Sequence, residues 1–201
     1  MVVVFWHQGE YYHGVKGHKM ILDCASSIGD ELGVTTPKAI KTHSNGKPYF
    51  SDSPLHFSLS HSEDLWACAF SDSEIGLDVQ YKKEKNYIRT AQRMFTENER
   101  TYIVERSATY ADAFYKIWTR MEAFAKCTGE GIFAERPDLA DSDGKLLDQV
   151  NWKDEPYYFA NFEIEDIAGG QSNRFASALC SKAPVNKALT KVKEIKDLDE
   201  I

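Results

Sequence analysis

An aromatic ring, a carboxylate and an ammonium recur one helical turn apart in the stretch from Trp118 to Gly131. Read as a helix, this stretch places Trp118, Glu122 and Lys126 at i, i+4 and i+8, so the three side chains share one stripe. Such a stripe could bring charges of both signs to a substrate. Taken alone, the stripe is better explained by an amphipathic helix with Trp118 in the core and Glu122 and Lys126 in a surface ion pair worth about 0.3–0.5 kcal/mol.

A second stretch, Glu74 to Gln80, gives the stripe a chemical partner. It reads as a buried strand that carries Asp78 and Gln80, and residues two apart on a strand point to the same side. An acid on a strand beside an acid on a helix forms an oxygen-rich site suited to a divalent cation. The sequence therefore predicts that Asp78 and Glu122 converge on one metal ion.

Composition excludes several other classes of function. The chain has 201 residues and a formal charge of -7, which argues against general nucleic-acid binding because phosphate-backbone affinity needs clustered Lys and Arg. The apolar opening from Met1 to Trp6 is too short for a signal peptide, and no run approaches the roughly 18 apolar residues of a membrane span. We expect a soluble, cytoplasmic protein without a membrane partner.

The cysteines indicate neither a metal site nor a disulfide framework. There are four of them, scattered without a CxxC pair, and we expect reduced thiols in the core. They are Cys24, Cys68, Cys127 and Cys180.

The first third of the chain predicts a strand, a helix and a possible anion site. Residues Val2 to Trp6 read as a strand, and apolar residues at helical spacing predict a helix from Lys19 to Leu32, stopped by Gly33. Lys16 and Lys19 would then lie near a helix N-terminus, where they could bind an anion. A solvated basic turn explains the same residues equally well.

Two hairpins follow. Asn45-Gly46 is a strong turn signal between two short strands, and HFSLSHS and LWACAFS alternate across the polar turn at residues 62–64. The second hairpin brings Ser60 and His61 towards the end of a strand. His61 between two hydroxyls suits a phosphate contact, although a solvated turn histidine is the open alternative.

From residue 74 onwards the pattern predicts helices followed by strands. Helical spacing begins near Tyr87, Thr96 and Glu99 match a capping box, and a further helix runs from about Tyr110 through the Trp118 stripe. QVNW, YYFANFEI and RFASALC alternate as antiparallel strands, whereas the tail, residues 182–201, reads as an exposed helix or a frayed end. We expect an α+β fold of two similar halves, residues 1–73 and 74–201, each a helix packed on a small antiparallel sheet.

Five motifs in order resemble the 4'-phosphopantetheinyl transferases, specifically their larger, pseudodimeric class, similar to the surfactin-synthetase activators. The resemblance covers about residues 12–180. The motifs are GKPYF at 46–50, FSLSHS at 57–62, GLDVQ at 76–80, FTENE at 95–99 and WTRMEAFAKCTGEGI at 118–132.

The resemblance implies transfer of the phosphopantetheine arm of coenzyme A to a serine of an apo acyl or peptidyl carrier protein, with Mg²⁺ and release of adenosine 3',5'-bisphosphate. The N-terminal half would supply the coenzyme A contacts and the C-terminal half the metal and catalytic residues. Two halves in one chain imply a monomer. The implied coenzyme A contacts are Lys47 and Pro48 at the adenine, Ser60 and His61 at the phosphates, and Lys126 at the diphosphate. The implied metal positions are Asp78, Gln80 and Glu122, and Glu122, Lys126 and Asp78 would be the catalytic residues.

Two departures from the family pattern leave an alternative open. Met121 stands where relatives commonly carry Lys, and Gln80 where many carry Glu. Met121 cannot bind phosphate, and Gln80 lacks charge for a metal. The alternative is therefore a catalytically weakened protein of the same fold that binds coenzyme A or a carrier protein. In either case the basic residues Lys82, Lys83, Arg89 and Arg93 are a docking face for an acidic carrier or merely a solvated surface.

Overall fold

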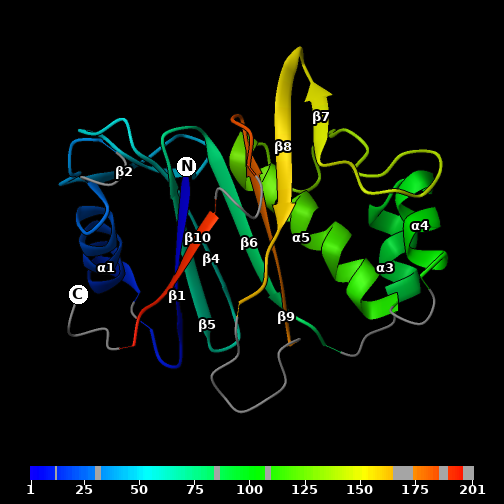
Figure 1. Ribbon diagram of the computed structural model, residues 1–201, viewed down its shortest axis with the longest axis horizontal. Helices are drawn as coiled ribbons and strands as arrows, with labels where there is room; N and C mark the ends of the chain where they lie inside the picture. Colours follow the sequence, from blue (N-terminus) through cyan, green and yellow to red (C-terminus); the bar gives the residue numbers. More distant parts are fainter. Residues whose placement is uncertain are drawn as a thin grey trace.

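The computed structural model describes residues 1–11, 13–29, 33–83, 87–106, 110–164, 174–185 and 190–196. Within these ranges lie four helices, two four-stranded sheets and one two-stranded sheet, which confirms the expected α+β class. Figure 1 shows the two larger sheets side by side, with α1 (Gly14–Ser26) at one end and α3 (Tyr87–Met94), α4 (Glu97–Val104) and α5 (Tyr110–Thr128) at the other. The division into two halves at residue 73 stays a prediction.

The first sheet has the strand order β10-β1-β5-β4. As expected, the second predicted hairpin forms, and its two strands pair antiparallel through a turn in which Glu63 has φ 54°. The shorter hairpin also forms, with Gly46 at φ 88° in its turn. The strands are β1 (Val2–Gln8), β4 (His56–Ser62), β5 (Leu65–Ser71) and β10 (Thr190–Glu194), with β2 (Ile40–Thr42) and β3 (Pro48–Phe50) in the short hairpin.

The second sheet has the order β6-β9-β8-β7 and is antiparallel, as the alternating pattern predicts. Helix α5 packs against its β6 strand, and Gly76 explains how closely. A Cβ on Gly76 would lie 1.9 Å from the carbonyl oxygen of Ala123 and 2.5 Å from the amide of Cys127, so only glycine permits this approach. The sheet consists of β6 (Ile75–Tyr81), β7 (Gln149–Trp152), β8 (Glu155–Asn161) and β9 (Phe175–Ser181).

Three serine side chains join the two sheets where β4 runs beside β6. The hydroxyl oxygens of Ser58, Ser60 and Ser62 accept hydrogen bonds from the backbone amides of residues 77, 79 and 81, at 2.9, 3.2 and 2.9 Å. All three serines are buried, and they share one side of β4 because residues two apart on a strand point the same way. We call this junction the serine seam. It fixes β4 to β6 with side chains where a continuous sheet would use backbone pairs.

The capping box at the start of α4 is confirmed and extends into a buried ion pair. Thr96 accepts from the Glu99 amide, and the Glu99 carboxylate accepts from the Thr96 amide at 3.0 Å. The same carboxylate, fully buried, binds Arg136 through two oxygens at 2.5 and 2.7 Å and accepts the Leu139 amide. These bonds satisfy the buried charge and tie the loop after α5 to α4.

Two expectations about element boundaries are wrong. Helix α1 begins at Gly14 and ends at Ser26, whereas a helix from Lys19 to Leu32 was expected. After Ser26 the Ser27 hydroxyl donates to the Cys24 carbonyl at 2.8 Å, and this side-chain bond competes with the backbone bonds that would continue the helix. Gly33 has a positive φ of 65°, and residues 30–32, which would precede it in the expected helix, lie outside the described residues.

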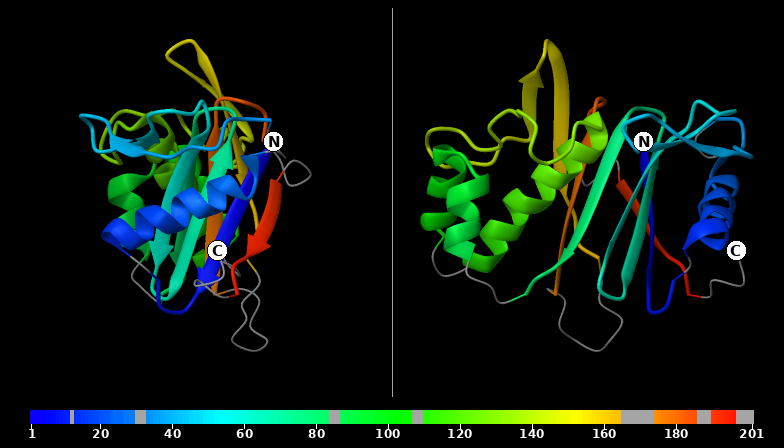
Figure 2. Two further views of the ribbon diagram at one scale, coloured as in Figure 1. Left: turned by 90° about the vertical axis from the view of Figure 1, so that its left-hand side faces the viewer. Right: turned by 180° about the vertical axis from the view of Figure 1, so that it is seen from behind.

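The tail is likewise no helix where the structure describes it. Its residues 190–194 form β10, which pairs in parallel with β1, and the His7 ring and the Trp6 carbonyl bond to the backbone of Ile195. Figure 2 shows this strand from two further sides, along the outer edge of the first sheet. The strand was missed because its alternation is mostly charged and Val192 is its one large apolar residue.

The expectation of reduced cysteines in the core is confirmed, because all four are free and buried. No described helix combines the length and apolar character needed to cross a membrane.

Candidate functional site

The centre of the site is Asp78, in the middle of β6 and 5% exposed. Its Oδ1 accepts from the Ser60 hydroxyl at 2.9 Å and from the Lys126 ammonium at 2.8 Å, while that ammonium also donates to Ser60 Oγ at 2.8 Å. Its Oδ2 is buried and has no hydrogen-bond partner among the described residues. One carboxylate oxygen is therefore fixed by a serine and a lysine, and the other is left for something the chain does not itself provide.

Glu122 completes the acidic part of the site. It lies one helical turn before Lys126 on α5, and its carboxylate makes no hydrogen bond or ion pair within the described ranges. Burial raises the pKa of both carboxyls, and the Asp78 charge raises the pKa of Glu122 further, whereas Lys126 lowers the pKa of each. The Asp78 charge thus acts on Glu122, while the convergence of the two carboxylates on one metal ion stays a prediction.

A cavity of about 610 Å³ opens beside these residues. One wall is formed by the turn of the short hairpin and the start of β3, residues 45–48, and by residues 57–59 of β4. The other is formed by the α5 stripe and the loop at residues 129–132. Glu122, Lys126, Lys47 and Pro48 all line it. The volume falls in the range of about 300–1,000 Å³ typical of small-molecule sites.

Lys47 is held at the cavity wall by the residue before β6 and by the end of α5. Its ammonium donates to the Glu74 carboxylate and, at 2.7 Å, to the Cys127 carbonyl at the end of α5. His56 Nδ1 lies 3.3 Å from the other Glu74 oxygen. A cation at the C-terminal end of α5 also suits the helix dipole. These two bonds hold the ammonium in place and leave one of its three donors for a ligand in the cavity.

This cluster gives a testable dependence of stability on pH. The hydrogen bond from His56, followed by the Lys47 ammonium, lowers the pKa of Glu74 from 4.5 to about 2. A depressed carboxyl pKa stabilises the fold above the unfolded value, and this contribution is lost as pH falls from about 4.5 towards 2. We expect Glu74→Gln to lower the melting temperature at pH 6 and to differ little from the parent near pH 2. Thermal unfolding at both pH values measures this, and an equal loss at both would contradict it.

His61 lies in a cluster of rings next to the start of α1. Its ring centroid is 6.1 Å from that of His13 and 5.7 Å from that of Tyr11. Burial, followed by the charges of His13 and Lys126, lowers the pKa of His61. Lys16 lies in the first turn of α1, so the structure brings it to the same end of the helix as His13, whereas Lys19 pairs with Asp23 at 2.6 Å.

The two positions that depart from the family pattern have different surroundings. Met121 is fully buried in the core that α5 forms with its sheet, so whatever occupies position 121 faces packing and not the cavity. Gln80 lies on the same side of β6 as Asp78, and its amide nitrogen donates to Ser62 at the end of the serine seam, at 3.1 Å.

Three features of the site were not predicted from the sequence. They are the Lys47–Glu74–His56 cluster, the two hydrogen bonds that join Ser60 to Asp78 and Lys126, and the Oδ2 of Asp78 that has no hydrogen-bond partner among the described residues. One signal was available: serine at positions 58, 60 and 62 repeats at the period of a strand, which indicates a polar side facing something other than solvent.

Comparison with known proteins agrees with the geometry. The family model of the 4'-phosphopantetheinyl transferase superfamily matches residues 74–180, a stretch that contains Asp78, Gln80, Glu122 and Lys126. The chain is similar to 4'-phosphopantetheinyl transferase gsp of Aneurinibacillus migulanus, with 33% identity over 44% of this chain and 37% of the relative. It is similar to psf-1 of Bacillus pumilus, with 36% identity over 46% and 40%, and to Sfp of Bacillus subtilis strain 168, with 28% over 62% and 57%. The matched stretches thus span between about two fifths and somewhat over half the length of these relatives.

Proposed function

Since the chain belongs to the 4'-phosphopantetheinyl transferase superfamily, we propose that it transfers the 4'-phosphopantetheine arm of coenzyme A to a serine of an apo acyl or peptidyl carrier protein. Adenosine 3',5'-bisphosphate would be the other product. The observation that carries the proposal is Asp78, which is buried, has one oxygen without a partner among the described residues, and bonds to Lys126. Lys126 and Glu122 in turn line a cavity of about 610 Å³.

The residues present fit a Mg²⁺ ion. Asp78 offers a desolvated oxygen without a partner, and Glu122 offers a second carboxylate that is likewise unbonded within the described residues. Two carboxylates suit Mg²⁺, which commonly takes one or two of them together with substrate phosphates and water. Asp78 and Glu122 would hold the ion, with Gln80 at a third position facing it. When bound, the ion would polarise the phosphoryl group and offset charge on the leaving oxygen.

The remaining chemistry falls to the chain's own residues. The carrier serine Oγ forms a bond to the phosphorus that bears pantetheine, and the diphosphate bond to adenosine 3',5'-bisphosphate breaks. Lys126 can contact the diphosphate while it stays bonded to Asp78 and Ser60, because an ammonium has three donors and these bonds use two. Glu122, which lines the cavity, is the proposed base for the serine proton.

Ser60 has a different part in this scheme from the phosphate contact that the resemblance implies. Its hydroxyl donates to Asp78 and accepts from the Val79 amide and Lys126, which uses its full capacity of one donor and two acceptors. We therefore assign Ser60 as a positioning residue that orients Asp78 and Lys126. His61 remains the proposed phosphate contact at this strand end, with Lys16 and Lys19 as proposed anion contacts on α1.

The variant Ser60→Ala tests that assignment. We expect transfer to slow and the Mg²⁺ requirement to rise, because Asp78 loses the bond that aims its carboxylate, whereas coenzyme A affinity measured without metal should stay near the parent value. Ser58→Ala is the matched control, since it removes a neighbouring bond of the serine seam that does not touch Asp78. A large loss of metal-free coenzyme A binding in Ser60→Ala alone would restore Ser60 as a phosphate ligand.

One assay tests the proposed function as a whole. The protein is incubated with coenzyme A, Mg²⁺ and a panel of apo carrier proteins, and each carrier is weighed by mass spectrometry. A gain of one phosphopantetheinyl group supports the transferase. Binding of coenzyme A without any gain would support the weakened binding protein, although the burial of Met121 removes one reason for that alternative. Absence of both would defeat either proposal.

The carrier's docking face and the cellular setting remain proposals. Of the basic residues expected to attract an acidic carrier, Lys82 pairs with Asp112 at 2.7 Å and Lys83 pairs with Glu63. Helix α3 exposes Arg89 and Arg93 together with Ile88, so we propose α3 as the surface that contacts the carrier protein. A cytoplasmic monomer is the proposed form of the protein.

A further inference from the structure

A second polar stripe runs along α5, away from the candidate site. It consists of Asp112, Lys116 and Arg120, again at i, i+4 and i+8. Lys116 and Trp118 are two residues apart and therefore about 200° apart around the helix. The two stripes thus face opposite flanks of α5.

The second stripe ends in a cavity of about 500 Å³ between α4, α5 and the loop before β7. Four of the described side chains that line it are basic, and one is acidic. The basic ones are Arg106, Lys116, Arg120 and Lys145, and the acidic one is Asp148. We call this cavity the basic bay. In a chain with a formal charge of -7, such a concentration of cations does not follow from composition.

Arg120 forms the floor of the basic bay and is held rigidly. Its Nε donates to Asn161 at 2.7 Å, one terminal nitrogen to the Leu147 carbonyl at 2.7 Å, and the other to Asp148 at 2.9 Å. These bonds use three of the five guanidinium donors and leave two. Asp148 is 82% exposed, so solvent screens the charge that it opposes to Arg120.

The rim supplies further positive charge. Arg106 is fixed by bonds to the carbonyls of Tyr102 and Gly144, at 2.9 and 3.2 Å, and its guanidinium lies 4.0 Å above the Tyr102 ring. It also pairs at 3.7 Å with the Glu105 carboxylate, which is 52% exposed, so solvent screens that negative charge. Lys116 and Lys145 are exposed, and neither ammonium makes a hydrogen bond or ion pair with any residue in the described ranges. Two positioned guanidiniums and two uncommitted ammoniums therefore surround one hollow.

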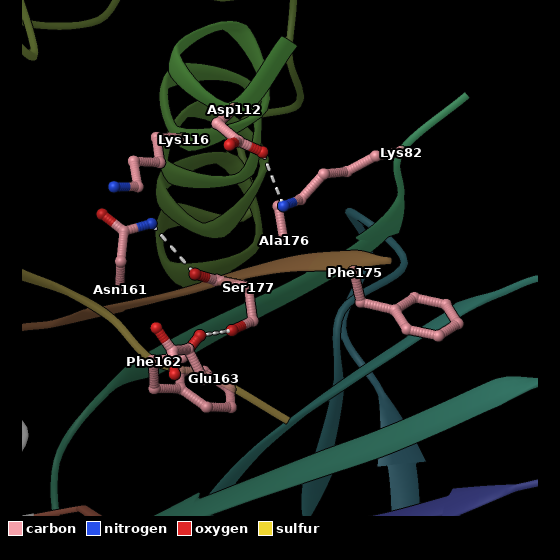
Figure 3. A pocket seen from close by; sticks show the side chains of 9 residues that line it. All are labelled: Lys82, Asp112, Lys116, Asn161, Phe162, Glu163, Phe175, Ala176 and Ser177. Atoms are coloured by element: carbon pink, nitrogen blue, oxygen red, sulfur yellow. Dashed lines mark hydrogen bonds and ion pairs between the residues drawn. The ribbon is translucent and has the colours of Figure 1, made fainter. Parts of the chain in front are cut away.

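A neighbouring cavity of about 260 Å³ on the same flank of α5 serves as a comparison, because in it a basic and an acidic side chain pair with each other (Figure 3). It shares Lys116 and Asn161 with the basic bay, but Lys82 and Asp112 neutralise each other across it at 2.7 Å, and the Asn161 amide donates to the Ser177 carbonyl. In Figure 3 the Lys116 ammonium points away from the Lys82–Asp112 pair. The excess of positive charge thus belongs to the basic bay and not to the flank as a whole.

We propose that the basic bay is a second anion-binding site, distinct from the candidate active site, and that it takes the phosphate group of a small molecule. A compact anion with several acceptor oxygens matches paired guanidinium and ammonium donors, and charge-assisted bonds to phosphate are the strong ones. The basic bay and the cavity lined by Glu122 and Lys126 share no lining residue, so the two sites can be filled independently.

The test is an NMR titration of the ¹⁵N-labelled protein with inorganic pyrophosphate in the absence of Mg²⁺. We expect saturable shifts of the amides of residues 102–106, 116–120 and 144–148, separate from any response of the amides near Asp78. In Lys116→Glu/Lys145→Glu the affinity read from these amides should fall at least about tenfold, because two attractive charges become repulsive. The response near Asp78 should stay as in the parent.

Two controls make the result decisive. The variant Lys38→Glu/Lys41→Glu has the same change in net charge, within β2 and just before it, at the far end of the molecule (Figure 1), and should bind as the parent does. If the charge-reversed variant fails to fold, Lys116→Ala/Lys145→Ala takes its place, with a smaller expected loss of affinity for pyrophosphate. The proposal is overturned by absence of saturable shifts at the basic bay, by equal shifts with sodium chloride at matched ionic strength, or by undiminished binding in the reversed variant.

Discussion

Asp78→Asn should reduce phosphopantetheine transfer by about 10²- to 10³-fold or more, the loss typical when one preorganised charge at a reacting centre is removed. Asparagine keeps the shape and an oxygen for Ser60 and Lys126, so the serine seam and the fold should survive. What disappears is the negative charge of the buried oxygen that has no partner among the described residues. The transfer rate is measured by carrier mass, and the fold by thermal unfolding.

Metal binding gives this variant a readout independent of turnover. Isothermal titration of Mg²⁺ into the complex with coenzyme A should show binding in the parent and little in Asp78→Asn. Asp138→Asn is the matched control, because that carboxylate accepts only an exposed bond from Asn98 and lies outside the cavity. Full transfer by Asp78→Asn would remove the metal assignment, whatever the effect on stability.

Glu122→Gln should slow transfer by about 10²- to 10⁴-fold, the contribution of a positioned general base. The protein should fold normally, because the Glu122 carboxylate makes no hydrogen bond to the described residues and its burial already disfavours the charged form. The amide cannot accept the serine proton. The expected result is a lower kcat with coenzyme A binding largely retained.

The same variant separates the two roles proposed for Glu122. If Glu122 acts only as the base, the variant should have a lower kcat at an unchanged Mg²⁺ requirement. If Glu122 also holds the metal, the variant should require more Mg²⁺ as well. Glu130 lines the same cavity from the loop after α5, so Glu130→Gln serves as the control for a lost carboxylate near the substrate. Transfer by Glu122→Gln at the parent rate would exclude both roles.

The sequence predicted those elements whose signals are local. Thr96 and Glu99 form their capping box, the alternation of β4 and β5 forms its hairpin, and the period of α5 places Glu122 and Lys126 on one stripe. In each case residues within a few positions of one another decide the conformation. The strand period also fixes the side of β6 on which Asp78 lies, where it meets Lys126 of this stripe; the convergence of Glu122 with Asp78 stays a prediction.

Features that depend on distant partners could not be predicted. Gly76 carries no pattern of its own, yet its missing side chain lets α5 rest on the backbone of β6 and brings Lys126 to within 2.8 Å of Asp78. Lys47 was expected only at a ligand, but Glu74, 27 positions later, holds its ammonium. Basic side chains such as Arg106 and Lys145 gather into one hollow only once α4 and the loop before β7 are packed together.

The pairing of β10 with β1 has a consequence for the order of events during synthesis. Strand β1 lies between β5 and β10, so one of its two edges waits for residues 190–194, which are synthesised long after β1 itself. Until then that edge offers unpaired amides and carbonyls to any other extended chain. Nascent protein should therefore be most prone to self-association just before residues 190–194 emerge, and a chaperone that shields an open strand edge would help most at that moment.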